Sequence, residues 1–132
     1  MNSVSDLLLV AIGGGAGALL RGGVDTLAAR FGFAAPLATL SINVAGSFFA
    51  GLIAVLLVDR SILPEAARPL LLIGLLGGFT TFSAFSLQLA RMGDAGEALP
   101  LLVYAAGSLL LGFAAAVAGI ALGRPSSVRR IG

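Results

Sequence analysis

The fold of this chain depends on ten residues near its middle, Gly77-Gly78-Phe79-Thr80-Thr81-Phe82-Ser83-Ala84-Phe85-Ser86. They lie inside an uncharged stretch, residues 70–90, that matches the roughly 20 apolar residues needed to span a bilayer core. Two adjacent glycines followed by hydroxyl residues favour an interrupted helix over a continuous hydrophobic one. At membrane depth, irregular backbone survives only where protein buries it or where it lines a wet cavity. The segment therefore predicts a transmembrane helix that breaks beside a polar feature.

The composition of the whole chain indicates a membrane protein. Of its 132 residues, 58% are hydrophobic and 11% are charged, and the mean hydropathy is +1.08. A soluble domain carries about 25% charged residues, so this chain cannot cover a water-facing surface. It has no cysteine and no histidine, which removes thiol chemistry and the commonest general base and metal ligand. We expect neither an enzyme nor a nucleic-acid partner, because no catalytic constellation and no basic patch is present.

Uncharged stretches separated by short polar joints predict an all-α membrane protein with four transmembrane helices in one domain, residues 1–132. The expected spans are approximately 5–29, 34–58, 69–91 and 98–123. The first is long enough only if its helix continues through Arg21 and Asp25. The third is expected to break in mid-membrane. The start of the chain lacks a basic run, so no signal peptide is expected.

The arginines are shared unequally between the two sides of these spans. The positive-inside rule places the richer side, which also carries both termini, in the cytoplasm. The richer side has Arg60, Arg68, Arg124, Arg129 and Arg130, and the poorer side has Arg30 and Arg91.

Hydroxyl and amide side chains recur at helical spacing in two of the spans. Thr39, Asn43 and Ser47 share one face of the second, and Tyr104 and Ser108 share one face of the fourth. A membrane asparagine often only bonds a neighbouring helix, and a buried tyrosine usually only finds one partner. Both interpretations, a packing role and a polar track, stay open.

The residues at the break allow similar alternatives. Phe82 and Phe85 project to one side if the helix has resumed. An isolated pair would face lipid or core, but beside a break the positive ring edges can meet a partly dehydrated anion. The hydroxyls of Thr80, Thr81, Ser83 and Ser86 can cap the broken ends or bond back to their own backbone. The break also frees backbone carbonyls, which can hold a small cation such as Na⁺.

Charged side chains avoid the middle of the spans. Arg21 either snorkels or pairs with Asp25, four residues on, or it gathers anions at a pore mouth. A proton-coupled exporter normally needs a titratable group at depth, whereas neutral donors suit an anion. The acids, all near span ends or in joints, are Asp6, Asp25, Asp59, Glu65, Asp94 and Glu97.

Three motifs then occur in order: Gly17-Ala18-Leu19-Leu20-Arg21, Thr39-Leu40-Ser41-Ile42-Asn43-Val44-Ala45-Gly46-Ser47-Phe48, and the segment 77–86. With the Tyr104–Ser108 spacing, they resemble the CrcB/Fluc family of small four-span fluoride channels over nearly the whole chain. The resemblance implies passive fluoride export across a bacterial plasma membrane. It also implies an antiparallel, dual-topology homodimer with two pores, embedded in membrane lipid.

The resemblance further implies roles for individual residues. The backbone carbonyls of Gly77 and Thr80, from both subunits, would hold a central structural Na⁺, and Arg21 would lie toward an aqueous vestibule. The fluoride pathway, made of ring edges and neutral donors, would comprise Asn43, Phe82, Phe85, Tyr104, Ser108, Thr39 and Ser83.

Three positions depart from the family pattern, and the departures at Ala84 and Gln88, which remove polar groups near the pathway, bear on rate and gating. Gly22 stands where an aromatic residue is common, Ala84 where threonine is common, and Gln88 where many members have glutamate. The arginine bias indicates either weakly set topology or a second, oppositely biased partner chain; a self-sufficient homodimer is the preferred interpretation. Two other functions stay open: a small four-span proton-coupled multidrug exporter, and a non-transporting membrane scaffold.

Overall fold

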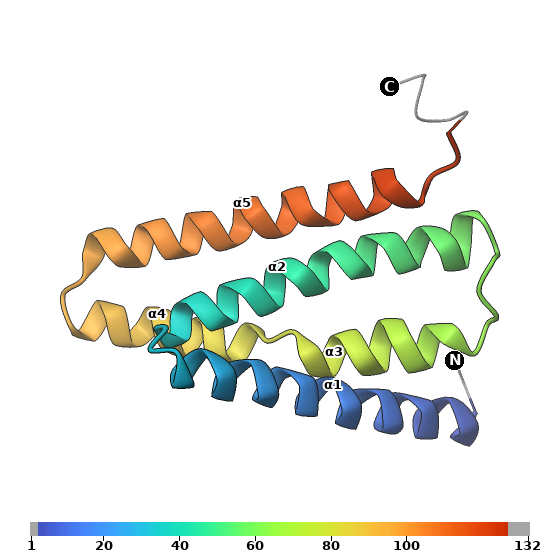
Figure 1. The fold of residues 1–132 in the computed structure, drawn as a ribbon, viewed down its shortest axis with the longest axis horizontal. Coiled ribbons are helices and arrows are strands. Elements are labelled where there is room, and N and C mark those ends of the chain that lie inside the picture. Colours follow the sequence, from blue (N-terminus) through green and yellow to red (C-terminus); the bar gives the residue numbers. More distant parts are fainter. Residues whose placement is uncertain (1–2, 127–132) are drawn as a thin grey trace.

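The computed structural model describes residues 3–126, which form helices joined by short turns (Figure 1). Four stretches, 4–30, 35–59, 68–94 and 98–123, are long and apolar enough to cross a membrane. The prediction of an all-α chain with four such helices is confirmed. In chain order the elements are α1 (Val4–Arg30), α2 (Ala35–Ala54), the π-helical η1 (Val55–Asp59) and η2 (Arg68–Leu75), α3 (Leu76–Phe79), α4 (Phe82–Asp94) and α5 (Ala98–Gly123).

The first helix shows why the sequence forms a long span here. Ser3 caps it, because the Ser3 side chain accepts a hydrogen bond from the backbone N–H of Asp6 at 3.2 Å. The Asp6 side chain bonds back to the Ser3 backbone, which completes a capping box. The helix continues through Arg21 and Asp25 to Arg30, as a membrane-spanning length requires. A turn with Gly32 at positive φ then reverses the chain.

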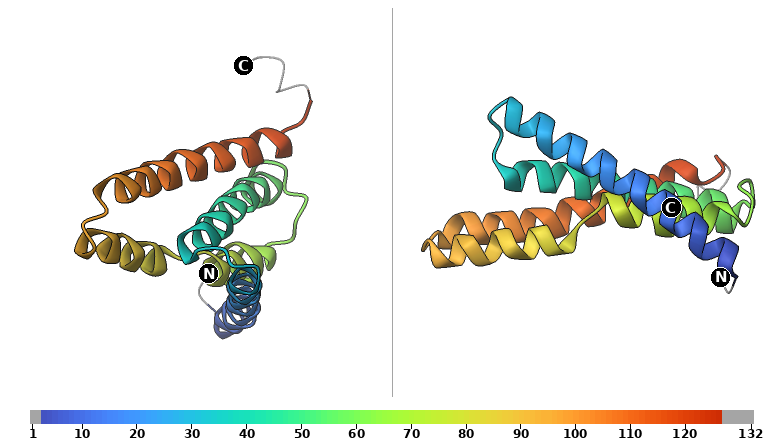
Figure 2. Two further views of the ribbon diagram at one scale, coloured as in Figure 1. Left: turned by 60° about the vertical axis from the view of Figure 1, so that its left-hand side comes forward. Right: turned by 90° about the horizontal axis from the view of Figure 1, so that it is seen from below.

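The helices pack in two close pairs. α5 lies along α2, and α1 lies along η2 and α3; Figure 2 shows α1 crossing the other helices obliquely. Glycines bring the backbones together in both pairs. A Cβ added at Gly17 would collide with the carbonyl oxygen of Leu75, and one added at Gly119 would collide with that of Phe48. Small residues at such crossings permit close packing between membrane helices.

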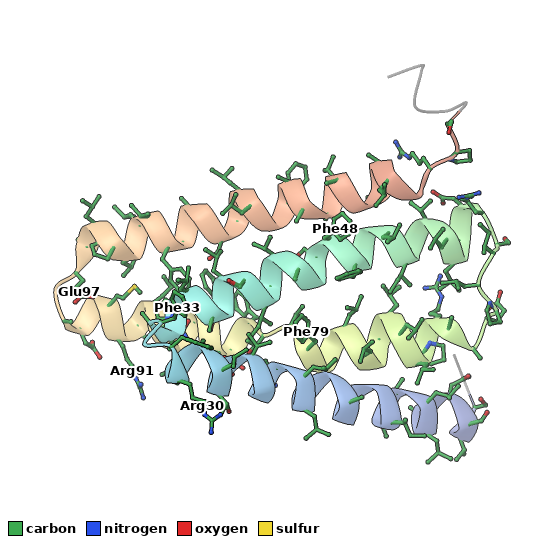
Figure 3. The ribbon with its side chains drawn as sticks, in the orientation of Figure 1. Arg30, Phe33, Phe48, Phe79, Arg91 and Glu97 are labelled. Carbon is green, nitrogen blue, oxygen red and sulfur yellow. The ribbon has the colours of Figure 1, made fainter. Side chains whose placement is uncertain are left out.

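The turns between the helices lie at two opposite ends of the molecule. The start of α1, the end of α5 and the η1–η2 connection lie at one end, where Arg60 Nη1 donates to the carbonyl of Gly123 at 3.2 Å (Figure 1). Arg30, Arg91 and Glu97 lie at the other end (Figure 3). Two of the arginines expected on the richer side, Arg129 and Arg130, lie outside the described residues.

Candidate functional site

The third span is interrupted at Thr80 and Thr81, between α3 and α4. Thr80 has φ −78° and ψ 159°, and Thr81 has φ −150° and ψ 121°, so both residues are extended. The predicted break is therefore present. Extended backbone cannot continue the helical hydrogen-bond ladder, and each polar group that it releases at membrane depth requires another partner.

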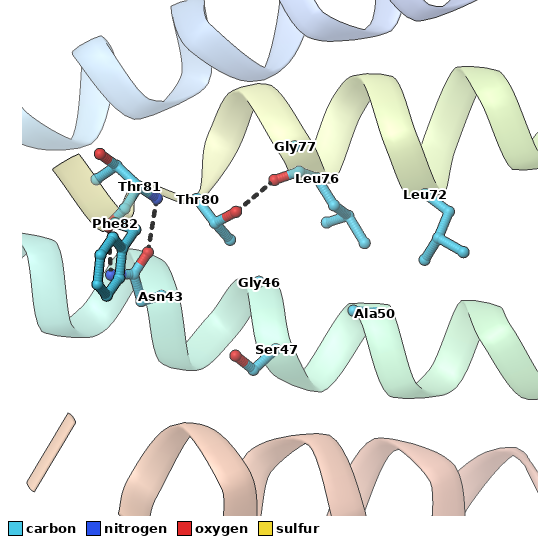
Figure 4. Close-up of a pocket in the computed structure, with 10 residues that line it drawn as sticks. All are labelled: Asn43, Gly46, Ser47, Ala50, Leu72, Leu76, Gly77, Thr80, Thr81 and Phe82. Carbon is cyan, nitrogen blue, oxygen red and sulfur yellow. Dashed lines mark hydrogen bonds between the residues drawn. The ribbon is translucent and has the colours of Figure 1, made fainter. Parts of the chain in front are cut away.

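Asn43, on α2, supplies a partner for both backbone groups of Thr81. The Thr81 N–H donates to Asn43 Oδ1 at 2.8 Å, and Asn43 Nδ2 donates to the Thr81 carbonyl at 2.9 Å (Figure 4). This pair of bonds ties the break to the second span. Of the two alternatives for Asn43, the structure thus shows a bond to a neighbouring helix. An amide nitrogen carries two N–H donors, so the second one is left for another acceptor.

The carbonyls of Gly77 and Thr80 lose their helical donors at this point. In a continuous helix they would accept from the N–H groups of Thr81 and Ala84, four residues on. The Thr81 N–H instead donates to Asn43, and the Ala84 N–H donates to Thr81 Oγ1 at 3.2 Å. Two backbone oxygens are thereby freed within four residues of each other. Oxygen ligands of this kind suit a hard cation, so these residues fit the Na⁺ that the resemblance implies.

Arg21, on α1, reaches the same segment from the opposite helix. Its Nε–H donates to the Gly78 carbonyl at 3.2 Å, and the side chain is half-buried. Within residues 3–126, Arg21 and Asp25 form no ion pair. The i,i+4 pair considered from the sequence is therefore wrong, because the guanidinium turns toward a carbonyl that the break has released.

Aromatic rings continue from the break along α4 to α5. The ring centroids of Phe82 and Phe85 are 5.9 Å apart, so both rings project to one side as predicted. Phe85 and Tyr104 meet edge to face, with centroids 5.1 Å apart and planes at 66°. Phe82 is 78% exposed, whereas Tyr104 is buried. The row of rings therefore begins on the open surface of the protomer and ends in its interior.

A chain of side-chain hydrogen bonds crosses three helices behind these rings. The Tyr104 hydroxyl donates to Gln88 Oε1 at 2.6 Å, and Gln88 Nε2 donates to Thr39 Oγ1 at 2.9 Å. The sequence singled out Gln88 only as a departure from a family pattern. The sequence did offer a signal for its role. Gln88 lies four residues after Ala84 and seven after Thr81, so it shares a helix face with the residues at the break.

The serines of the predicted pathway have different surroundings. Ser83 is exposed, and its Oγ lies 3.2 Å from Thr81 Oγ1. Ser108 is one turn beyond Tyr104 on α5, and its buried Oγ has no hydrogen-bond partner among residues 3–126. A buried hydroxyl without a partner costs free energy unless another molecule or ion meets it. The structure therefore brings Asn43 and Ser83 to the break and leaves Ser108 with donor capacity to spare.

Two hollows flank the break. One has a volume of about 390 Å³ and opens between α2 and α3, with Asn43, Ser47 and Phe82 among the side chains that line it (Figure 4). The other has a volume of about 180 Å³, and its polar lining comes from Asp25, Thr39, Thr81 and Gln88. Thr81 lines both hollows, so the Asn43–Thr81 bonds stand between them.

Replacing Gln88 by leucine is expected to lower the thermal stability of the protein. The change leaves two buried hydroxyls, those of Tyr104 and Thr39, without their shared partner, at a cost of about 1–3 kcal/mol for each unsatisfied group. Thermal unfolding in detergent, followed by circular dichroism, measures the effect. Gln88→Glu is the matched control, because glutamate keeps an acceptor for the Tyr104 hydroxyl. An unchanged Tm for Gln88→Leu would show that the bonds contribute nothing.

Comparison of the sequence with known proteins places the chain in a family. A family model described as CrcB-like protein, camphor resistance (CrcB), matches residues 8–120. A protein of Paracoccus denitrificans named fluoride-specific ion channel FluC is 46% identical over 117 residues, which cover 89% of this chain and 93% of that protein. A protein of the same name from a Methylobacterium species is 44% identical, and the match covers 87% of this chain and 90% of that protein. Another of the same name, from Chloroflexus aurantiacus, is 41% identical, and the match covers 92% of this chain and 97% of that protein. The chain therefore belongs to the CrcB family and is a multi-pass protein of the bacterial inner membrane.

Proposed function

We propose that this protein is a fluoride-selective passive ion channel through which fluoride leaves the cytoplasm. The observation that carries the proposal is the broken third span, whose released backbone is tied to Asn43 beside the rings of Phe82 and Phe85. The relatives named fluoride-specific ion channel support it, because they align over most of both chains.

The chemistry of the site suits a small, strongly hydrated anion. Moving a bare ion from water into a low-dielectric medium costs tens of kcal/mol on idealised estimates, so protein donors must replace its water. Binding must also be weak enough for release. Neutral groups meet both demands: the second N–H of Asn43, the unpartnered hydroxyl of Ser108, the hydroxyl of Ser83, and the ring edges of Phe82 and Phe85.

Two hydroxyls of the expected pathway, those of Tyr104 and Thr39, are hydrogen-bonded within the protomer. The Tyr104 hydroxyl donates its hydrogen to Gln88, and Thr39 accepts from Gln88. Thr39 keeps its own hydroxyl hydrogen, whereas Tyr104 retains only acceptor capacity until its bond to Gln88 opens. On this proposal Tyr104 shapes the pathway by its contact with Phe85, and Thr39, which is buried, supports Tyr104 through Gln88.

The backbone of the break adds a favourable field. The N-terminus of α4 begins at Phe82, inside the membrane span, and the positive end of a helix dipole favours anions there. The carbonyls of Gly77 and Thr80, with their equivalents in a second copy, would hold the structural Na⁺. When bound, that ion supplies a fixed positive charge. Charged side chains are thus not needed in the narrow part.

An antiparallel homodimer with two pores completes the proposal. Phe82 is 78% exposed in the single protomer, and the larger hollow beside it is open. Lipid can cover an exposed ring, but it cannot meet the polar groups of the hollow beside Phe82, so that hollow needs a covering surface. A second copy in the opposite orientation would bring its own break to this face and enclose the donors of both. Because five arginines lie on one side of the spans and two on the other, the positive-inside rule favours a single orientation, so this part of the proposal requires that topology be set weakly.

Fluoride efflux from proteoliposomes, recorded with a fluoride-selective electrode, tests the proposal. With a potassium ionophore present to carry the balancing charge, we expect rapid fluoride efflux, and no comparable chloride efflux when a chloride electrode follows chloride-loaded vesicles. Phe82→Ile should lower the fluoride rate by about tenfold or more, because an aliphatic group of similar size has no positive edge to replace lost water, and each 1.4 kcal/mol is a factor of ten.

Phe113→Ile is the matched control, because Phe113 lies on α5 and is 70% exposed. Wild-type flux from Phe82→Ile would show that the pathway is lined differently. An absence of fluoride efflux from folded wild-type protein would refute the function, and efflux that follows an imposed proton gradient would indicate an exporter instead.

A further inference from the structure

We propose that Arg21 is a positioning residue that fixes the backbone of the break through the Gly78 carbonyl, and that its contribution to flux comes from this bond more than from attracting anions. The inference deepens the proposed channel function. Its test by fluoride efflux rests on that function, whereas its test by amide hydrogen exchange does not.

The bond replaces one that the break removes. In a continuous helix the Gly78 carbonyl would accept from the N–H of Phe82, which here is the first residue of α4. The carbonyl accepts instead from Arg21 Nε at 3.2 Å. Gly77 and Gly78 are neighbours in α3, and their two peptide planes are joined through the φ and ψ angles of Gly78, so holding the Gly78 carbonyl in place narrows the orientations that the Gly77 carbonyl can take. Arg21 therefore acts on the group proposed to face Na⁺ without touching the ion.

The arginine is carried on a part of α1 that cannot easily move. Gly17 is one helical turn before Arg21, and a Cβ at Gly17 would collide with the Leu75 carbonyl oxygen. On the facing helix, a Cβ at Gly78 would collide with the carbonyl oxygen of Gly14. The two backbones thus touch on the N-terminal side of the bond. Such contact gives the Arg21 side chain a fixed base from which to reach the break.

Two side chains from different helices consequently hold the unwound segment by hydrogen bonds. Arg21 on α1 holds Gly78, before the extended residues, and Asn43 on α2 holds Thr81, within them. Of these two side chains, only Arg21 is charged. An arginine and a lysine carry the same charge, but only arginine has a donor at Nε within a planar group of fixed geometry. Arg21→Lys therefore keeps the charge that would attract anions but loses the hydrogen bond that would position the break.

The experiment compares Arg21→Lys and Arg21→Gln with wild type. Hydrogen exchange of the amides of Thr80, Thr81 and Ala84 reports the break directly, since each donates a bond there. Fluoride efflux is measured at about 10 mM and about 1 M salt, where the screening length is roughly 30 Å and 3 Å. Arg30→Gln is the matched control, because it removes an exposed arginine from the last turn of the same helix.

We expect both Arg21 variants to raise exchange at the break by roughly tenfold, as loss of a charge-assisted hydrogen bond predicts. Both should lose flux to a similar extent at either salt concentration, and Arg30→Gln should change neither quantity. Wild-type exchange and flux in Arg21→Lys, with flux lost in Arg21→Gln only at low salt, would overturn the proposal in favour of anion attraction. If Arg21→Gln does not fold, Arg21→Lys alone decides.

The two readouts also separate the inference from the proposed function. Faster exchange in Arg21→Lys, together with no fluoride flux in wild type, refutes the channel and leaves the positioning role standing. Fluoride flux in wild type, together with unchanged exchange in both Arg21 variants, refutes the positioning role and leaves the channel standing.

Discussion

Replacing Asn43 by aspartate is expected to abolish most fluoride flux. The change removes the N–H that donates to the Thr81 carbonyl and sets a second oxygen against it at a place where 2.9 Å now separates donor and acceptor. Leaving one buried partner unsatisfied costs about 1–3 kcal/mol, and more when a charge is introduced. Since 1.4 kcal/mol is a factor of ten, the population with an intact break should fall by roughly ten- to a hundredfold.

Flux from proteoliposomes and thermal unfolding are measured on the same preparation. Ser41→Ala is the matched control, because the Ser41 hydroxyl is exposed on α2 and donates only to the Leu37 carbonyl of its own helix. We expect flux and Tm to fall together in Asn43→Asp and to stay unchanged in Ser41→Ala. Lost flux with a wild-type Tm would mean that Asn43 acts on the anion alone, and wild-type flux would remove Asn43 from the pathway altogether.

The break itself could be predicted from the sequence because its causes are local. Gly77 and Gly78 weaken the helix, and Thr81 offers a hydroxyl to the new N-terminus, where it accepts from the Ala84 N–H. The four spans could be predicted for a similar reason, since length and apolarity are properties of each segment alone. Even the shared side of Phe82 and Phe85 follows from a spacing of three within one helix.

The partners of the polar side chains could not be predicted, because they depend on how the helices pack. Spacing placed Arg21 four residues from Asp25, yet the guanidinium bonds Gly78, which is 57 residues away in the chain. Packing of α1 against α3 brings the carbonyl within reach, and the sequence does not show that packing. Gln88 joins Thr39 and Tyr104 only because α2, α4 and α5 converge. Each of these bonds is tertiary, and each concerns a candidate site residue.

Replacing Gly17 by alanine is expected to destabilise the whole protein and to stop flux. The new Cβ would collide with the Leu75 carbonyl oxygen and lie 2.7 Å from the Phe79 backbone nitrogen. Both are backbone atoms, which cannot rotate away as a side chain can, so α1 must move off η2 and α3. Overpacking of this kind costs about 1–3 kcal/mol. The same movement would carry Arg21 away from Gly78.

Gly15→Ala is the control that makes this test specific. It adds the same methyl group to the same helix two residues earlier, where nothing lies within 4 Å of the new Cβ. We expect its Tm and flux to stay at wild-type values, since surface changes usually alter stability by no more than about 0.5 kcal/mol. If Gly17→Ala matches wild type in both measurements, α1 can shift without disturbing the break. The packing of α1 would then not be needed to keep Arg21 beside Gly78, and only the bonds from Asn43 on α2 would fix the break.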